Sequence, residues 1–244
     1  MELCIKNKID NIAVIGDSHE NFKGILYYSN SFYKLENSLV FAAGDFGVGR
    51  FTESHYINIF YHYNKELIKN NNTVIVIRGN HDDPLYFNNG NLNHSNIILV
   101  PDYTVVTVGN INILLVGGAI SVDRVQRLRK GNTYWFDEAF VYDEEKLDKI
   151  NKKITHVITH SAPNFCFPDK KDGIMHWLLN DEGLLYDINK ERADHTKLYE
   201  YLIKNGHPIK EWFYGHFHGS KVEYINDIKY TMLNILELKI LKDE

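Results

Sequence analysis

Acidic, amide and imidazole side chains follow five short apolar segments of this chain. The sequences concerned are GDSH, GDFG, GNHD, THSAP and GHFH, in that order. Carboxylate oxygens and imidazole nitrogens are ligands for manganese, iron, zinc or nickel. Together these donors suit a site for two metal ions. The candidate residues are Asp17, His19, Asp45, Asn80, His81, Asp82, His160, His216 and His218.

Two pairs of these residues are separated by a single position. In an extended segment, residues i and i+2 project to the same side. Asp17 and His19 could therefore share one ion, and His216 and His218 could face the same cluster. A glycine precedes the donor in four of the five sequences. Glycine permits a tight turn and a close backbone approach, which lets the next side chain project into a crowded centre.

The apolar segments that precede the donors are expected to be buried strands. They are short, rich in β-branched or aromatic residues, and most end in glycine or a polar residue, which is typical of covered strands. Ligands of open α/β sheets bind beyond the carboxyl ends of the strands, so the donors should meet at one edge. The predicted strands are 11–16, 38–44, 73–79, 155–160 and 211–215.

Helical and hairpin patterns lie between the predicted strands. Apolar residues recur at helical spacing in 52–70 and in 191–204, where His195 belongs to the stripe. Two alternating runs surround GN in 103–116 and ND in 221–235, which predicts two hairpins. Alternating strands and helices predict an α/β fold, and the hairpins predict antiparallel additions or a second sheet.

The length and composition are those of one globular domain covering residues 1–244, with 44% apolar residues to bury a core. The mean hydropathy of -0.34 and the lack of a long apolar run exclude a membrane span. The first ten residues do not resemble a secretory signal. Cys4 and Cys166 are too few for a disulfide framework or a thiolate metal site. A cytoplasmic location is therefore expected.

The charge of the chain bears on its partners. A net charge of -5 and an isoelectric point near 6.2 disfavour binding of long nucleic-acid duplexes by a basic face. A small phosphate substrate needs only local positive charge, which bound metal ions can supply. The sequence gives no indication of stable nucleic-acid binding or of a membrane partner, and nothing in it specifies an oligomeric state.

The ordered series GDxH, GD, GNHD, a later single histidine and GHxH resembles the calcineurin-like metallophosphoesterase superfamily, of the bacterial and phage type. The resemblance extends from residue 11 to about residue 218. It implies a four-layer α/β/β/α sandwich, in which two mixed sheets are flanked by helices. It also implies a metal-dependent phosphoric ester hydrolase, either a phosphatase or a phosphodiesterase, whose substrate is a phosphate ester.

The resemblance implies two divalent ions that share one carboxylate. Manganese is expected most, with iron, zinc or nickel as alternatives. Two such ions about 3.5–4 Å apart lower the pKa of a bridging water and clamp the phosphoryl oxygens, and the hydroxide attacks phosphorus in line. The residues implied for the first ion are Asp17, His19 and His218, with Asp45 bridging both ions. The residues implied for the second ion are Asn80, His160 and His216.

The resemblance assigns His81 a catalytic role other than metal binding. His81 would protonate the leaving oxygen or stabilise the transition state, and Asp82 would orient its ring. Asn80 and His81 would also contact the substrate. Because Asn80 is a neutral ligand, it adds no charge that repels a phosphate.

Two further segments are expected to border the site. The segment 117–138 carries Arg124 and Arg127. Arg124, and with it Arg127, could reach a substrate phosphate or pair with acids near the site, since arginine suits bidentate contacts. The segment 161–188 connects two ligand-bearing elements, and it could form a lid or insertion that shapes the substrate pocket.

Two other functions are weighed against this hydrolase. Phosphoserine/threonine phosphatases of the superfamily usually carry GDxVDRG and GNHE. Here the second sequence is GDFGVGR, with Arg50 displaced by one position, and the third ends in Asp82, which weakens that hypothesis. A catalytically silent scaffold would be expected to lose ligands, and this chain keeps them all. Small phosphomonoesters or nucleotides, phosphoproteins and phosphodiesters stay open as substrates.

Overall fold

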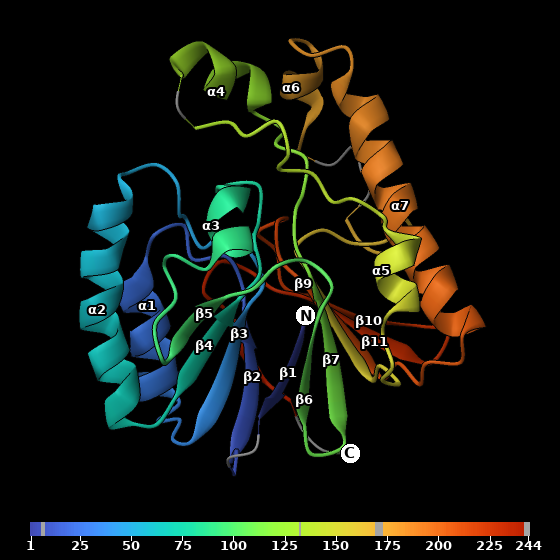
Figure 1. The fold of residues 1–244 in the computed structure, drawn as a ribbon. Helices are drawn as coiled ribbons and strands as arrows, with labels where there is room; N and C mark the ends of the chain where they lie inside the picture. The colour runs from blue at the N-terminus through green and yellow to red at the C-terminus, as the bar shows by residue number, and fades with distance from the viewer. Residues whose placement is uncertain (6–7, 132, 169–172, 242–244) are drawn as a thin grey trace.

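The computed structural model describes residues 1–5, 8–131, 133–168 and 173–241. Two β-sheets face each other, and helices cover the outer face of each sheet (Figure 1). The expected four-layer α/β/β/α sandwich with two mixed sheets is therefore confirmed. Within the described residues, no helix has both the length and the apolar character that a membrane crossing requires.

The first sheet has five strands in the order β12-β2-β3-β4-β5. β2 (Asn11–Ile15), β3 (Ser38–Ala42), β4 (Thr73–Val76) and β5 (Ile97–Leu99) run parallel, and β12 (Leu238–Ile240) is antiparallel to β2. α1 (Phe22–Leu26), the π-helix η1 (Tyr27–Phe32) and α2 (Glu53–Lys69) cover its outer side, and α3 (Pro84–Asn89) lies at one end (Figure 1).

The second sheet has seven strands in the order β1-β6-β7-β8-β9-β11-β10. The strands are β1 (Glu2–Ile5), β6 (Thr104–Val108), β7 (Ile111–Val116), β8 (His156–Thr159), β9 (Glu211–Tyr214), β10 (Lys221–Ile225) and β11 (Ile228–Met232). α5 (Glu144–Asp148) and α7 (Leu184–Lys204) cover its outer side. α4 (Arg124–Lys130) and α6 (Met175–Leu178) lie beyond the sheets, at the upper end in Figure 1.

Side-chain alternation along the strands explains the layers. In β2, Ile12 and Val14 pack between the two sheets, whereas Ala13 and Ile15 pack against α1 and α2. The same alternation in the second sheet separates residues that face the first sheet from residues that face α5 and α7. Because successive side chains of a strand point to opposite faces, strands covered on both sides need continuous apolar runs.

Most predicted elements are present, and the five predicted strands and both hairpins are confirmed. The helix predicted over 191–204 begins earlier, at Leu184, because Leu184 and Ile188 extend its buried stripe. The strands β1, β5 and β12 were not predicted. Each has only three or four residues.

Candidate metal centre

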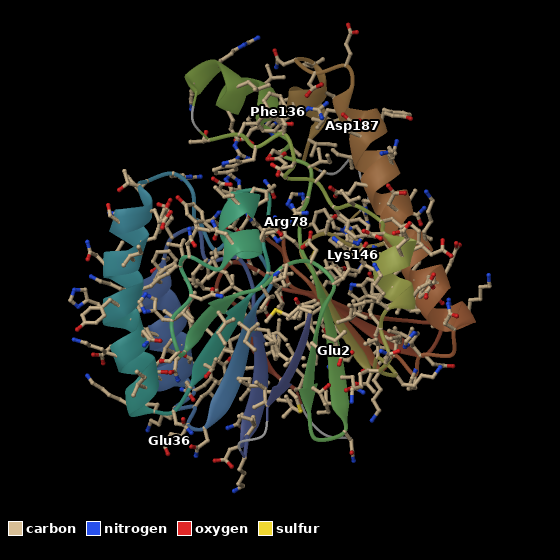
Figure 2. All side chains as sticks on the ribbon, viewed as in Figure 1. Glu2, Glu36, Arg78, Phe136, Lys146 and Asp187 are labelled. Atoms are coloured by element: carbon tan, nitrogen blue, oxygen red, sulfur yellow. The ribbon has the colours of Figure 1, made fainter. Side chains whose placement is uncertain are left out.

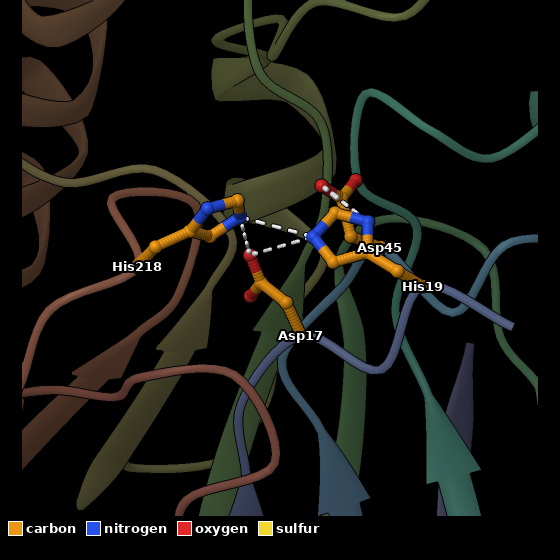
Figure 3. Close-up of side chains that lie close together, drawn as sticks. All are labelled: Asp17, His19, Asp45 and His218. Carbon is orange, nitrogen blue, oxygen red and sulfur yellow. Dashed lines mark hydrogen bonds and ion pairs between the residues drawn. The ribbon is translucent and has the colours of Figure 1, made fainter. Parts of the chain in front are cut away.

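One group of donors lies where the chain leaves β2, β3 and β9. Asp17, His19, Asp45 and His218 each offer one ligand atom, and these atoms lie within 4.8 Å of one another (Figure 3). His218 Nε2 is 3.2 Å from Asp17 Oδ2 and 3.0 Å from His19 Nε2. Imidazole and carboxylate donors that converge in this way suit a divalent cation. This set is called the first donor group.

A second group of donors shares Asp45 with the first and adds Asn80, His160 and His216. His160 Nε2 lies 3.2 Å from both Asp45 Oδ1 and Asn80 Oδ1. The other ring nitrogen of His160, Nδ1, lies 2.7 Å from the carbonyl oxygen of Ala43. Donation of Nδ1–H to this oxygen leaves the lone pair of Nε2 directed at the centre, as in many metal-binding histidines. The ring of His216 lies 5.1 Å from that of His160.

Asp45 stands between the two donor groups. Its Oδ1 faces His160, whereas its Oδ2 is 3.9 Å from His19 Nδ1 in the first donor group. One carboxylate whose two oxygens face two sets of ligands has the geometry of a bridge between two ions. The structure thus brings all seven sequence-predicted metal ligands together.

The charges of the donor groups favour a bound cation. Burial lowers the pKa of His160, but the carboxylates of Asp45 and Asp17 outweigh this effect and raise the pKa to about 10. Burial opposes ionisation of Asp45 as well, yet His160 holds the pKa of Asp45 well below its usual range. Burial lowers the pKa of His216, which keeps its ring neutral and able to bind a metal. The carboxylates thus attract positive charge and the His216 ring is neutral, whereas a cation that binds His160 would have to displace the proton from its ring.

The backbone of four ligands adopts the left-handed conformation. The φ angles are 45° for His19, 47° for Asp45, 67° for His216 and 50° for His218. Such angles are uncommon outside glycine and concentrate at functional sites. The prediction that each i, i+2 pair lies on an extended segment is therefore wrong. Both pairs lie in turns beyond β2 and β9, and the turns, not strand alternation, direct the side chains inward.

The glycines before the donors are needed for close approach. A Cβ at Gly79 would overlap Asp45 Oδ1, and a Cβ at Gly44 would overlap the His160 ring. Gly44 also has a φ of 95°, which side chains rarely adopt. The sequence-based role of these glycines agrees with the structure.

Comparison with known proteins shows the family. The family model for calcineurin-like phosphoesterases matches residues 11–220, which is most of the chain and contains both donor groups. The chain belongs to the calcineurin-like phosphoesterase family. No curated protein shows a significant sequence match to it.

Solved structures share the fold of this family member at low sequence identity. TT1561 of Thermus thermophilus aligns with a TM-score of 0.54 and 13% identity, over 94% of this chain and 98% of that chain. A putative 5'-nucleotidase from Staphylococcus aureus aligns with a TM-score of 0.51 and 14% identity, over 96% of this chain and 51% of that one. At such identity the likeness establishes the fold alone.

Asp82 does not orient His81 in this family member, contrary to the expectation. Its carboxylate is fully buried and accepts four backbone N–H groups, at 2.6 to 3.0 Å. The donors are Phe46, Gly47, Val48 and Gly79. These bonds tie the turn after β3 to the turn after β4. Asp82 therefore acts on the site by shaping the loops that carry Asp45 and Asn80.

The contact that orients His81 comes from Arg50, whose Nη2 lies 3.1 Å from His81 Nδ1. Arginine can only donate, so Nδ1 accepts and the ring proton resides on Nε2. His81 Nε2 lies 4.0 Å from Asp45 Oδ2, beside the donor groups. Burial lowers the pKa of His81 to about 4. A neutral ring with Nε2–H at the centre is suited to donating a hydrogen bond.

A buried network that the sequence did not reveal orients Asn80. Asn80 Nδ2 donates to Ser121 Oγ at 3.0 Å, and Ser121 Oγ donates to Glu138 Oε2 at 2.8 Å. Arg127 donates to the carbonyl oxygen of Asn80 at 3.0 Å and to Ser121 Oγ. Because Arg127 can only donate and Glu138 takes the hydroxyl hydrogen, Ser121 Oγ accepts from the Asn80 amide. The Asn80 oxygen therefore faces His160.

Arg124 does not face the donor groups, so the substrate contact expected of it is not supported. Its guanidinium bonds to Asp181 at 2.5 and 3.0 Å and to Asp187 at 2.6 Å. Asp187 lies in the upper part of α7 (Figure 2). Arg124 thus joins α4 to α7 and to the residues that precede α7. Arg127 bonds to the carbonyl oxygen of Asn80, as described above.

The segment 161–188 is anchored to α7 by Arg192. The guanidinium of Arg192 is buried and donates to the carbonyl oxygens of Ala162, Pro163, Cys166 and Pro168. Residues 169–172 of the segment lie outside the described residues. The role of 161–188 as a lid stays a prediction.

His195, the polar member of the buried stripe of α7, packs in the protein interior. It is fully buried and its ring stacks on Phe140 at 3.9 Å. Burial lowers its pKa to about 3, so His195 packs as a neutral aromatic ring.

Proposed function

We propose that this member of the family is a dinuclear-metal phosphoesterase that hydrolyses phosphate mono- or diesters. The observation that carries the proposal is the position of Asp45, whose two oxygens face two separate donor groups. First-row divalent cations, with manganese first and iron, zinc or nickel as alternatives, fit this set of carboxylates, imidazoles and one amide.

Two divalent ions, when bound, supply an activated water and neutralise phosphoryl charge. The chain's residues supply the rest. His81 would donate Nε2–H to the leaving oxygen as negative charge develops there, which favours transition-state stabilisation over proton transfer. Arg50 is partly exposed beside His81, so it would hold the ring and offer its remaining N–H groups to phosphoryl oxygens.

We also propose a cytoplasmic location. The expected cytoplasmic location agrees with Cys4 and Cys166, which are both free thiols. The phosphoprotein phosphatase alternative retains the same donor groups, so substrate choice separates it from small-ester hydrolysis. The silent scaffold is disfavoured because the chain keeps every expected ligand.

The test uses metal-loaded protein with p-nitrophenyl phosphate and bis-p-nitrophenyl phosphate, in parallel with His81→Ala. We expect wild type to hydrolyse at least one ester, and His81→Ala to keep its metal content and lose about 10²-fold in kcat. Metal-replete wild type that hydrolyses neither ester faster than Asp45→Asn would contradict the proposal and support the scaffold.

A further inference from the structure

A pocket of about 480 Å³ lies beside the donor groups, at the carboxyl ends of β7, β8 and β9. His216 and His218 form part of its wall. A phosphoryl group held at the donor groups would therefore have this pocket as its neighbour. We call it the ester pocket.

The wall of the ester pocket away from the histidines is mainly apolar. Ile120 and Val122 line it from the loop after β7, Ile188 from α7, and Ile174 and Phe217 from the loops after β8 and β9. These residues belong to four separate segments that the fold brings together. Such walls bind organic groups by removing apolar surface from water.

Arg192 in the wall of the ester pocket is turned to other partners, whereas Glu191 Oε2 is buried without a hydrogen-bond partner among the residues that the structure describes. Arg192 is the only arginine or lysine among the pocket's described lining residues, and its guanidinium donates to four backbone carbonyl oxygens. Glu191 is buried, and burial raises its pKa to about 7. The Arg192 guanidinium is thus held by the backbone and is not directed at a second phosphate or a carboxylate.

We propose that the ester pocket binds the organic group of the substrate, and that this group is compact and apolar. The inference rests on the proposed function, because it assigns the phosphoryl group to the donor groups. A pocket of this volume accommodates a group of one or two rings, since ligand pockets span roughly 300–1,000 Å³. Among the open substrate classes, this favours esters of small apolar alcohols.

The test compares two esters of primary alcohols, cyclohexylmethyl phosphate and glycerol 1-phosphate. We expect wild type to prefer the cyclohexylmethyl ester in kcat/KM by about 10- to 200-fold, the range for apolar contacts in a pocket. Ile188→Asn and the half-buried Ile174→Asn should reduce this preference to a few-fold. Ile57→Asn, the same change on a partly exposed face of α2, should retain it.

A binding measurement separates this inference from the proposed function. Cyclohexylmethylphosphonate should bind metal-loaded wild type more tightly than 2,3-dihydroxypropylphosphonate, and Ile188→Asn and Ile174→Asn should abolish the difference in calorimetry. Equal kcat/KM for the two esters, with equal binding of the two phosphonates, overturns the ester pocket and leaves hydrolysis intact. Selective binding without hydrolysis of any ester supports the pocket and refutes the hydrolase.

Discussion

Replacement of Ser121 by alanine tests how the fold orients Asn80, a proposed metal ligand. The change removes the acceptor of Asn80 Nδ2 and of one Arg127 N–H, and the donor to Glu138. A buried polar group without a partner costs about 1–3 kcal/mol. Arg127 and Glu138 lie 3.4 Å apart and can close on each other, so we expect a net destabilisation of about 2–3 kcal/mol.

The effect on metal binding should be confined to one ion. Within the described part of the chain, the Ser121 side chain bonds to Asn80, Arg127 and Glu138, and none of these belongs to the first donor group. Residues that orient a metal ligand typically change metal affinity by about 10- to 100-fold. Ser121→Ala should therefore weaken the second ion by this factor and leave the first nearly unchanged.

Calorimetric titration of metal-free protein with Mn²⁺ measures the affinities of the two ions. Urea unfolding in the presence of a chelator measures the stability of the metal-free protein separately. Arg124→Ala is the matched control. It removes an arginine from α4, the helix that carries Arg127, but Arg124 pairs with Asp181 and Asp187 and not with the Ser121 network. The control should keep both affinities. Equal weakening of the two ions by Ser121→Ala, or no weakening of either, would refute this assignment of the network.

Three further predictions concern single residues. His195 has a folded pKa of about 3 against 6.5 unfolded, so the unfolded chain binds more protons as the pH falls below 6.5. Stability should then fall by roughly 1.4 kcal/mol per pH unit at this residue. Urea unfolding at pH 6.5 and 4.5 measures this loss of stability, and His195→Phe should lack the part that His195 contributes. An equal loss of stability between the two pH values in wild type and His195→Phe would contradict the prediction. Gly79→Ala should lose bound metal by mass spectrometry because of the overlap at its Cβ, whereas Gly183→Ala, where a Cβ makes only ordinary contact, should retain it. Arg50→Ala should lower kcat by about 10²-fold at constant metal content, whereas loss of activity in Arg129→Ala, an exposed site on α4, would argue for a general charge effect.

The convergence of the candidate metal ligands could be predicted because each lies within a few residues of the end of a strand, and parallel strands bring their carboxyl ends to one edge. The direction of each side chain could not. His19 and His218 reach the centre through left-handed turns, which the residue types alone do not reveal.

The roles of supporting residues depend on partners far away in the sequence. Arg124 is 57 positions from Asp181, and Asp82 meets backbone N–H groups more than 30 positions away. A short motif predicts that an arginine or aspartate lies near the site, but it does not predict which residue becomes its hydrogen-bond partner. Hydrogen-bond partners are therefore the part of the site that required the structure.

Anomalous diffraction from crystals grown with Mn²⁺ tests the central claim, that two ions share Asp45. The structure predicts two peaks about 3.5–4 Å apart. One should lie among Asp17, His19 and His218, and the other beside His160, with Asp45 between them. A single peak under saturating Mn²⁺, or two peaks of which neither contacts Asp45, would contradict the dinuclear centre.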